Sequence, residues 1–214
     1  MSIHIDGQGI GAIYVGGQPV AEVYRGADLV WSAQSWDFFD DFERSTIGSA
    51  WQGSGGLIDG TAPNRHLKKN TSAGNTAYWT VQQFDGDDFV VEALLGPVQD
   101  AQQAGSIVWG SPTDYVFVEF SKSGNNIIGD YNGSVWTTRA SLPAQQWDAG
   151  DVIRVERTGT TVRAFRNGTL LATGTSTLGR GAGKRRMALG VRMALNFFIR
   201  WYGPTFDEVR VRAT

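Results

Sequence analysis

The chain has 214 residues and a net charge of −2, the size of one large β domain or two small ones. Its 28 glycines, its 15 aspartates against six glutamates and its four lysines disfavour surface helices and favour strands and turns. The lack of cysteine excludes a disulfide scaffold, a thiolate zinc site and a cysteine nucleophile, and two histidines cannot build a histidine-rich metal centre. No apolar run approaches the ~20 residues that span a bilayer and the first residues do not resemble a signal peptide, so we expect a soluble, cytoplasmically made chain without membrane insertion.

Charge is unevenly distributed along the chain. Residues 1–136 carry six basic and 16 acidic residues, whereas residues 137–214 carry 13 basic and five acidic residues. The small net charge gives no general attraction to nucleic acid, and no nucleic-acid partner is expected. The two halves either form opposed patches or cancel each other where they interleave in one domain, and cancellation is the simpler expectation.

The first 33 residues contain a short internal repeat. Ile13–Val20 aligns with Val23–Val30, and each unit has an apolar residue and a tyrosine before a glycine-containing turn and apolar residues after it. The repeat predicts a short β-meander arm over residues 1–33, followed by a linker. About 30 residues cannot bury enough surface to be stable alone, so we expect the arm to dock on the main domain, another subunit or a larger assembly.

Residues 36–214 show strand and turn patterns at the spacing typical of an antiparallel sandwich. Asn167-Gly168 lies between two apolar runs and predicts a tight hairpin. No segment has a helical period over three turns. We therefore predict an all-β fold, a two-sheet antiparallel jelly-roll sandwich, with these strands: 89–95, 105–109, 115–120, 151–157, 160–166, 169–173, 187–193 and 206–212.

Both ends of this domain resemble a known family. The opening run Trp36–Arg44 followed by Ile47–Trp51, and the closing runs Gly150–Gly159, Val162–Thr169 and Phe206–Val211, resemble the first and last strands of concanavalin A-like, laminin-G-like jelly rolls. The resemblance implies a concanavalin A-like fold over residues 36–214.

The arm carries a second resemblance. Its units Tyr14–Gly17 and Val23–Trp31 resemble the N-terminal segment of minor tail proteins of siphophages that infect actinobacteria, and the ratio of 15 arginines to four lysines fits a GC-rich genome. The resemblance implies a phage tail protein that is made in the host cytoplasm and incorporated into the virion. Its partners would be other tail or virion proteins and a host cell-surface glycan, and a homo-oligomer is expected, with a trimer favoured.

Catalytic patterns are missing from the sequence. Some concanavalin A-like proteins are retaining glycosidases, which need two carboxyl groups ~5–5.5 Å apart. Their Glu-x-Asp-x-x-Glu run is absent, although acids from different strands could still form such a pair. A Gly-x-Ser-x-Gly elbow is also absent, and the glycine-rich segment Gly179–Arg185 lacks the spacing of a phosphate loop. We expect a protein that is not an enzyme.

A calcium site is a more plausible prediction than an active site. Jelly rolls of this kind often fix their termini with a hard cation held by carboxylates and backbone carbonyls. Asp41 in the opening strand and Asp207 in the closing strand could meet if the termini pair. A structural Ca²⁺ is thus one interpretation of these residues, and two solvated acids at strand ends are the other. No other cofactor is expected.

Sugar binding requires an aromatic face for the apolar side of a pyranose and polar groups for its hydroxyls. A glycine-containing loop supplies both types, and the candidate carbohydrate-binding residues are Tyr131, Asn132, Trp136 and Arg139. Trp136 could instead belong to the core or a sheet face. The basic segment Arg180–Arg186, expected to form a mobile loop, could meet an anionic wall polymer or simply be solvated.

Three functions follow from these patterns. The first is a lectin-like adhesin of a phage tail, in which the arm attaches to the virion and the jelly roll binds host cell-envelope glycans. The second is a purely structural or decoration protein of the virion without sugar binding. The third, which the missing acid pattern disfavours, is a glycan-degrading enzyme.

Overall fold

The structure is a computed structural model, and its described residues fall into two units, 1–36 and 37–214. All regular elements among the described residues are strands. Among the described residues no helix is long and apolar enough to cross a membrane. The described ranges are 13–15, 18–20, 22–25, 28–32, 36–53, 56–69, 74–97, 104–121, 126–144, 147–196 and 199–213.

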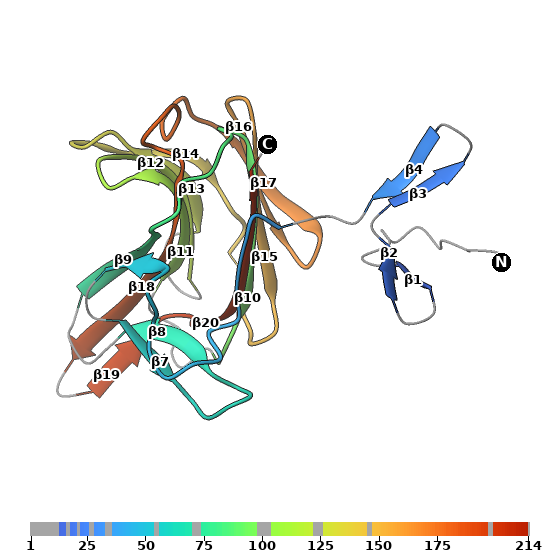
Figure 1. Cartoon of the computed structure of the whole chain (residues 1–214). Coiled ribbons are helices and arrows are strands. Elements are labelled where there is room, and N and C mark those ends of the chain that lie inside the picture. Colours follow the sequence, from blue (N-terminus) through green and yellow to red (C-terminus); the bar gives the residue numbers. More distant parts are fainter. Residues whose placement is uncertain are drawn as a thin grey trace. The chain divides into compact units, whose positions relative to one another are not determined.

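The first unit contains two antiparallel hairpins (Figure 1). Strand β1 (Ile13–Val15) pairs with β2 (Gln18–Val20), and β3 (Glu22–Arg25) pairs with β4 (Asp28–Ser32). These pairs coincide with the two strand–turn–strand repeats expected from the sequence, but they form separate two-stranded sheets rather than one meander. The predicted limits of the arm and its role in attachment stay predictions.

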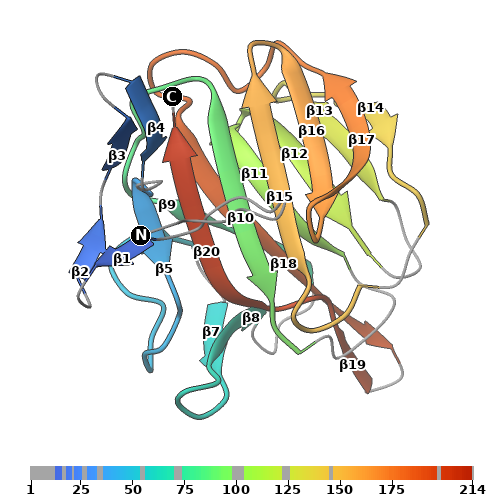
Figure 2. The same ribbon diagram turned by 90° about the vertical axis from the view of Figure 1, so that its right-hand side faces the viewer.

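The second unit is a sandwich of two eight-stranded antiparallel sheets, which lie face to face (Figures 1 and 2). We name each sheet after a central strand. The β20 sheet has the order β17-β16-β15-β10-β20-β8-β7, with β5 also paired to β20. Its strands are β17 (Thr169–Thr175), β16 (Thr161–Arg166), β15 (Val152–Thr158), β10 (Phe89–Leu95), β20 (Phe206–Ala213), β8 (His66–Lys69), β7 (Gly56–Asp59) and β5 (Phe38–Asp40).

The β11 sheet has the order β14-β13-β12-β11-β18-β9-β6, with β19 also paired to β18. Its strands are β14 (Trp136–Ser141), β13 (Ile127–Tyr131), β12 (Asp114–Phe120), β11 (Gly105–Ser111), β18 (Arg186–Asn196), β9 (Gly74–Thr80), β6 (Trp51–Gln52) and β19 (Ile199–Tyr202). All eight strands predicted from the sequence are present within a few residues of their expected limits. The fold is the predicted jelly-roll sandwich.

One apolar core fills the space between the sheets, and strict alternation of side chains creates it. Along β10, Phe89, Val91, Ala93 and Leu95 are buried while the residues between them are partly exposed. The same alternation on the other central strands leaves every second side chain for the outer faces. The outer face of the β11 sheet is therefore available for a site.

The Asn167-Gly168 hairpin has the geometry that its sequence predicts. Both residues have positive φ, 48° and 80°, as a two-residue type I′ turn requires. The Asn167 side chain also accepts a hydrogen bond from the Val152 N–H at 2.8 Å and donates one to Asp151 Oδ1 at 2.8 Å. The turn thus joins β16 to β17 and fastens the start of β15.

The buried carboxylate of Asp40 organises the opening segment of the sandwich. It accepts hydrogen bonds from Trp51 Nε1 at 2.6 Å and the Phe42 N–H at 2.8 Å, and both terminal nitrogens of Arg44 reach its two oxygens at 2.5 and 2.6 Å. Arg44 also donates to the Ile47 carbonyl oxygen. Asp40 thus joins Arg44 and Trp51, four and 11 residues further along the chain, in one hydrogen-bonded hub.

Removal of this carboxylate is expected to destabilise the fold strongly. In Asp40→Ala the indole N–H and the guanidinium lose a buried partner, so the free energy of unfolding should fall by about 3 kcal/mol. The exposed neighbour provides the control, because Asp41→Ala should change it by less than about 0.5 kcal/mol. Chemical denaturation of both variants measures the difference, and equal stabilities would contradict the assigned role of Asp40.

Candidate functional site

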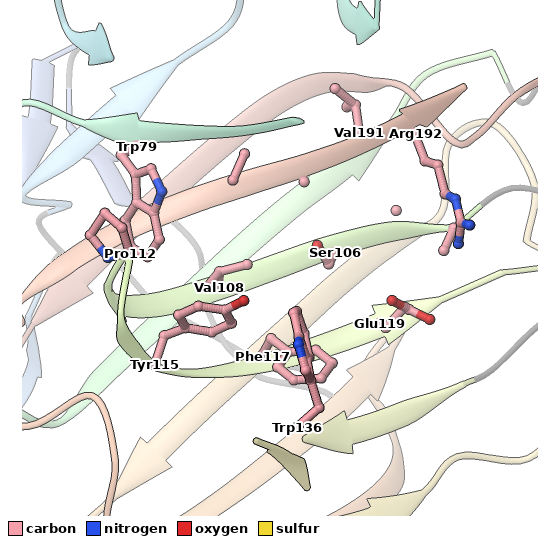
Figure 3. Close-up of a pocket in the computed structure, with 14 residues that line it drawn as sticks. Trp79, Ser106, Val108, Pro112, Tyr115, Phe117, Glu119, Trp136, Val191 and Arg192 are labelled. Carbon is pink, nitrogen blue, oxygen red and sulfur yellow. The ribbon is translucent and has the colours of Figure 1, made fainter. Parts of the chain in front are cut away.

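The outer face of the β11 sheet carries a groove of about 260 Å³. Its lining comes from β9, β11, β12, β14 and β18, together with Pro112 from the turn between β11 and β12 (Figure 3). On β12, Val116, Val118 and Phe120 enter the core, so the alternate side chains face this groove. The register of the sheet thus determines which residues form the site.

Aromatic rings form the wall of the groove on the β14 side. Trp136 is 60% exposed, and its ring stands nearly perpendicular to those of Tyr115 and Phe117, with centroids 5.7 and 5.2 Å away. Tyr131 packs against Trp136 at 4.9 Å. Edge-to-face contacts of this kind stabilise the ring positions, and they hold an exposed indole in a defined orientation (Figure 3).

Trp79 on β9 lines the groove as well. Its ring centroid lies 6.1 Å from that of Tyr115, at 65°. Burial raises the pKa of Tyr115 to about 12, with a smaller contribution from Tyr131, so its hydroxyl remains protonated at neutral pH. Tyr115 therefore offers the groove a hydroxyl donor beside the aromatic surface.

Two charged side chains line the groove beyond the aromatic rings (Figure 3). Glu119 on β12 is partly buried, and burial raises the pKa of its carboxyl group, while the charge of Arg192 on β18 lowers it by a smaller amount. Ser106 on β11 pairs with Glu119 on one side and with Gly190 on the other. A carboxylate, a hydroxyl and a guanidinium thus share one part of the groove.

The floor between these groups is low because Gly190 has no side chain. A Cβ atom built there would overlap Ser106 Oγ. Ala77 on β9 pairs with Gly190 and also lines the groove. The Ser106 hydroxyl thus fills the place of the missing Gly190 side chain, and these small residues give the groove a low floor that carries a hydroxyl group.

The structure brings some of the predicted carbohydrate-binding residues together and separates others. Tyr131 and Trp136 come together on the outer face, and Trp136 lines the groove. Asn132 is exposed, and its Oδ1 accepts hydrogen bonds from the Ser134 and Val135 N–H groups at 3.0 and 2.9 Å. It therefore shapes the turn that leads to Trp136.

Arg139 does not join the aromatic cluster. It is the extra residue of a β-bulge, because Gly129 pairs with Thr138 and the preceding residue of β13 pairs with Ala140. Its Nε donates to Asp130 Oδ2 at 2.7 Å, and Asp130 is only 1% exposed. The bulge therefore directs this guanidinium to a buried partner, and its predicted sugar contact stays untested.

Sequence reasoning did not select five residues of the groove. The sequence pattern that could have indicated most of them is the alternation of aromatic, acidic and small residues along the predicted strands 115–120 and 187–193. Their proximity could not be predicted, because only the pairing of strands far apart in sequence brings them together. These residues are Trp79, Tyr115, Phe117, Glu119 and Arg192.

The structure does not gather Asp41 and Asp207 into a metal site. Asp41 is exposed, and its Oδ1 accepts a hydrogen bond from the Glu43 N–H at 3.1 Å. Asp207 is partly buried and its Oδ1 has no hydrogen-bond partner. Among the described residues no three acidic or histidine side chains are placed to hold a metal ion, so the side chains do not fit the predicted Ca²⁺.

The basic segment expected to be a mobile loop is held by acids from the first half of the chain. Lys184 pairs with Asp114 at 2.5 Å and Arg185 with Asp87 at 2.8 Å. The hydrogen bond from Arg185 is the main cause that holds the pKa of Asp87 below its usual range. Charges of the two halves cancel here, which leaves fewer free cations for an anionic polymer.

A buried arginine of β15 binds the backbone that leads into this segment. Arg157 is 2% exposed, and its guanidinium donates to the carbonyl oxygens of Gly159, Ser176 and Leu178 at 3.0, 2.8 and 2.6 Å. Burial lowers the pKa of Arg157 to about 10, so it still carries its charge at neutral pH. The backbone just before the basic segment is thus fixed to β15, and the segment itself is held by its surface ion pairs.

No protein-family model matches the chain, and no curated protein matches its sequence. Solved structures share its fold. A Bacillus subtilis protein of unknown function with a galectin-like fold has 12% identity and a TM-score of 0.61, over 84% of this chain and 96% of that one. A Bacillus licheniformis β-glucanase has 14% identity and a TM-score of 0.58, over 83% and 98%.

The exoplasmic or lumenal domain of VIP36, in a form bound to Ca²⁺ and Man2, has 10% identity and a TM-score of 0.53, over 80% of this chain and 86% of that one. At such identities the likeness establishes the fold alone. The sandwich therefore has a concanavalin A-like and galectin-like jelly-roll fold, which occurs in lectin domains and in enzymes alike.

Asp207 allows a test of the cation prediction. Its pKa is raised from 3.8 mainly by burial, so the folded state binds this proton more tightly and the group lowers stability as pH rises above 3.8. Asp207→Asn should therefore raise the melting temperature at pH 7 and not at pH 3. Asp41→Asn, which changes an exposed acid, should leave it unchanged at both values.

The melts are measured in chelator and again in excess calcium. We expect the same increase for Asp207→Asn in both conditions. If calcium stabilises the parent and Asp207→Asn abolishes that gain, a cation site exists at Asp207 and the expectation is wrong.

Proposed function

We propose that this protein binds a glycan in the groove of the β11 sheet. The observation that carries the proposal is the exposed indole of Trp136, held by Tyr115 and Phe117 in a groove that also contains Glu119 and Arg192. A pyranose has an apolar face that stacks on such a ring and hydroxyls that need polar partners. The VIP36 domain among the structural neighbours, solved in a form bound to Ca²⁺ and Man2, supports the same assignment.

Binding without hydrolysis is the form of this function that the groove supports. A retaining glycosidase needs two carboxyl groups ~5–5.5 Å apart, and an inverting one needs them ~6.5–9.5 Å apart. Glu119 is the one carboxylate among the described residues of the groove lining. One structural neighbour is a β-glucanase, so an enzyme can have this fold. To hydrolyse a glycan in the groove, this chain would need a second carboxyl group near Glu119.

We further propose that the glycan belongs to a bacterial host and that the protein is part of a phage tail. The resemblance of residues 1–33 to the N-terminal segment of minor tail proteins supports this role, with the arm bound to other virion proteins. A single groove would bind weakly, but several copies that engage one surface gain affinity through effective concentration. A homotrimer or another closed oligomer would provide those copies.

Trp136→Ala should abolish most of the binding to host envelopes. The indole supplies the stacking surface, and its loss should weaken binding at least tenfold, while the lost ring contacts should lower the melting temperature by only a few degrees and leave the protein folded. Cosedimentation of the purified protein with actinobacterial cell envelopes measures this, before and after the wall polysaccharide is stripped. Leu170→Ala, which removes an equally exposed apolar side chain from the β20 sheet, is the control.

A salt series separates the possible sources of binding. Groove binding should be saturable, survive moderate salt and vanish on stripping. Binding that falls steeply with salt and is unaffected by Trp136→Ala would instead implicate basic side chains. A folded, oligomeric protein that binds no envelope would favour a purely structural role in the virion, and reducing-sugar release would favour an enzyme.

A further inference from the structure

Two groups of opposite charge lie in the groove, and the charge of Arg192 lowers the pKa of Glu119 across the space between them. Neither Glu119 nor Arg192 forms a hydrogen bond or ion pair through its side chain with the described residues. Both lie at the groove surface, one partly buried and the other exposed. Their opposite charges restrict the chemistry of any ligand that sits between them.

The two side chains face each other across β11. Glu119 pairs with Ser106, Ser106 pairs with Gly190, and Arg192 lies two residues further along β18, on the same face of the sheet as Gly190. Two strand spacings place β12 and β18 about 10 Å apart. A carboxylate that accepts hydrogen bonds and a guanidinium that donates them thus stand on opposite sides of a floor made by Ser106 and Gly190.

A secondary amide fits this arrangement. Its N–H and its carbonyl oxygen point in opposite directions, so one can donate to a carboxylate while the other accepts from a guanidinium. With a hydrogen bond at each end, such a group spans about 8 Å. An ammonium group would be repelled by Arg192, and an anionic substituent would be repelled by Glu119, so neither simple ion satisfies both sides.

The floor accommodates the methyl group of an acetylated amide. Val108 and Ala77 provide small apolar neighbours within the groove lining, while the Ser106 hydroxyl occupies the place of the missing Gly190 side chain. A hydroxyl group could bond to either charge, but it would leave this apolar space unfilled. The shape of the groove and the polarity of its two charged sides therefore both favour an acetylated amide.

We infer that the groove recognises an N-acetylated amino sugar, with the amide N–H donating to Glu119, the amide carbonyl accepting from Arg192 and the methyl group lying in the groove beside Val108. This inference rests on the proposed glycan-binding function and names the sugar class for the same groove. Trp136 would stack on the pyranose ring that carries the acetamido group or on its neighbour.

Methyl glycosides that differ only at C2 test the inference independently of glycosidic linkage. The probes are the 2-acetamido, 2-hydroxyl and 2-amino sugars of the gluco and galacto series, each titrated into ¹⁵N-labelled full-length protein while the Trp136 indole resonance is followed. In at least one series the acetamido sugar should bind at least tenfold more tightly than both others. Saturation transfer should reach its acetyl methyl protons.

Variants connect this preference to the two side chains. Glu119→Ala and Arg192→Ala should each reduce the preference for the acetamido sugar to about twofold or less, whereas Arg192→Lys, which retains a cationic donor, should keep part of it. Thermal melts check that each variant folds. Leu170→Ala again serves as the control and should leave the preference unchanged.

The outcomes separate this inference from the proposed function. If the 2-hydroxyl sugar binds as tightly as the acetamido sugar, or the 2-amino sugar binds most tightly, the inference is wrong while glycan binding stands. It is also wrong if no acetamido sugar binds to a protein that still binds envelopes through Trp136. If neither sugars nor envelopes bind, the proposed function itself fails.

Discussion

The face-to-face packing of two sheets on one apolar core is the constraint from which the rest of this structure follows. Each central strand directs alternate side chains into that core. The pairing register therefore determines which of its residues point outward. On β12 this places Tyr115, Phe117 and Glu119 outside, on the sheet surface that carries the groove. A slip of one residue along the strand would exchange these side chains with those of the core, and the groove would lose its chemistry.

Local pattern was sufficient to predict the fold but only part of the site. Alternation and the Asn167-Gly168 turn are properties of short segments, and they identified the strands because side-chain burial in a sandwich has the period of two that the sequence displays. Tyr131 and Trp136 were found for the same reason, since one hairpin holds both. Glu119 and Arg192 meet only because β11 lies between their strands, and a single sequence does not reveal that pairing.

Arg139 shows where sequence spacing gives the wrong impression of proximity. It follows Trp136 by three residues, which suggests a shared surface, but the bulge in β14 adds one residue and directs the guanidinium to buried Asp130. The charge imbalance between the two halves of the chain was more informative. Pairs such as Lys184 with Asp114 and Arg185 with Asp87 join the halves, so part of the surface charge is cancelled locally.

The position of Trp136 on β14 has an evolutionary consequence. Among the described strands β14 pairs with β13 alone, and its side chains are mostly exposed, so a substitution at Trp136 changes ring contacts on the outer face and leaves the core between the sheets in place. The wall of the groove can therefore diversify while the central strands keep the core intact. A lineage under pressure to follow changing surface sugars could alter its preference through this strand and the adjoining turn, without having to evolve a new domain.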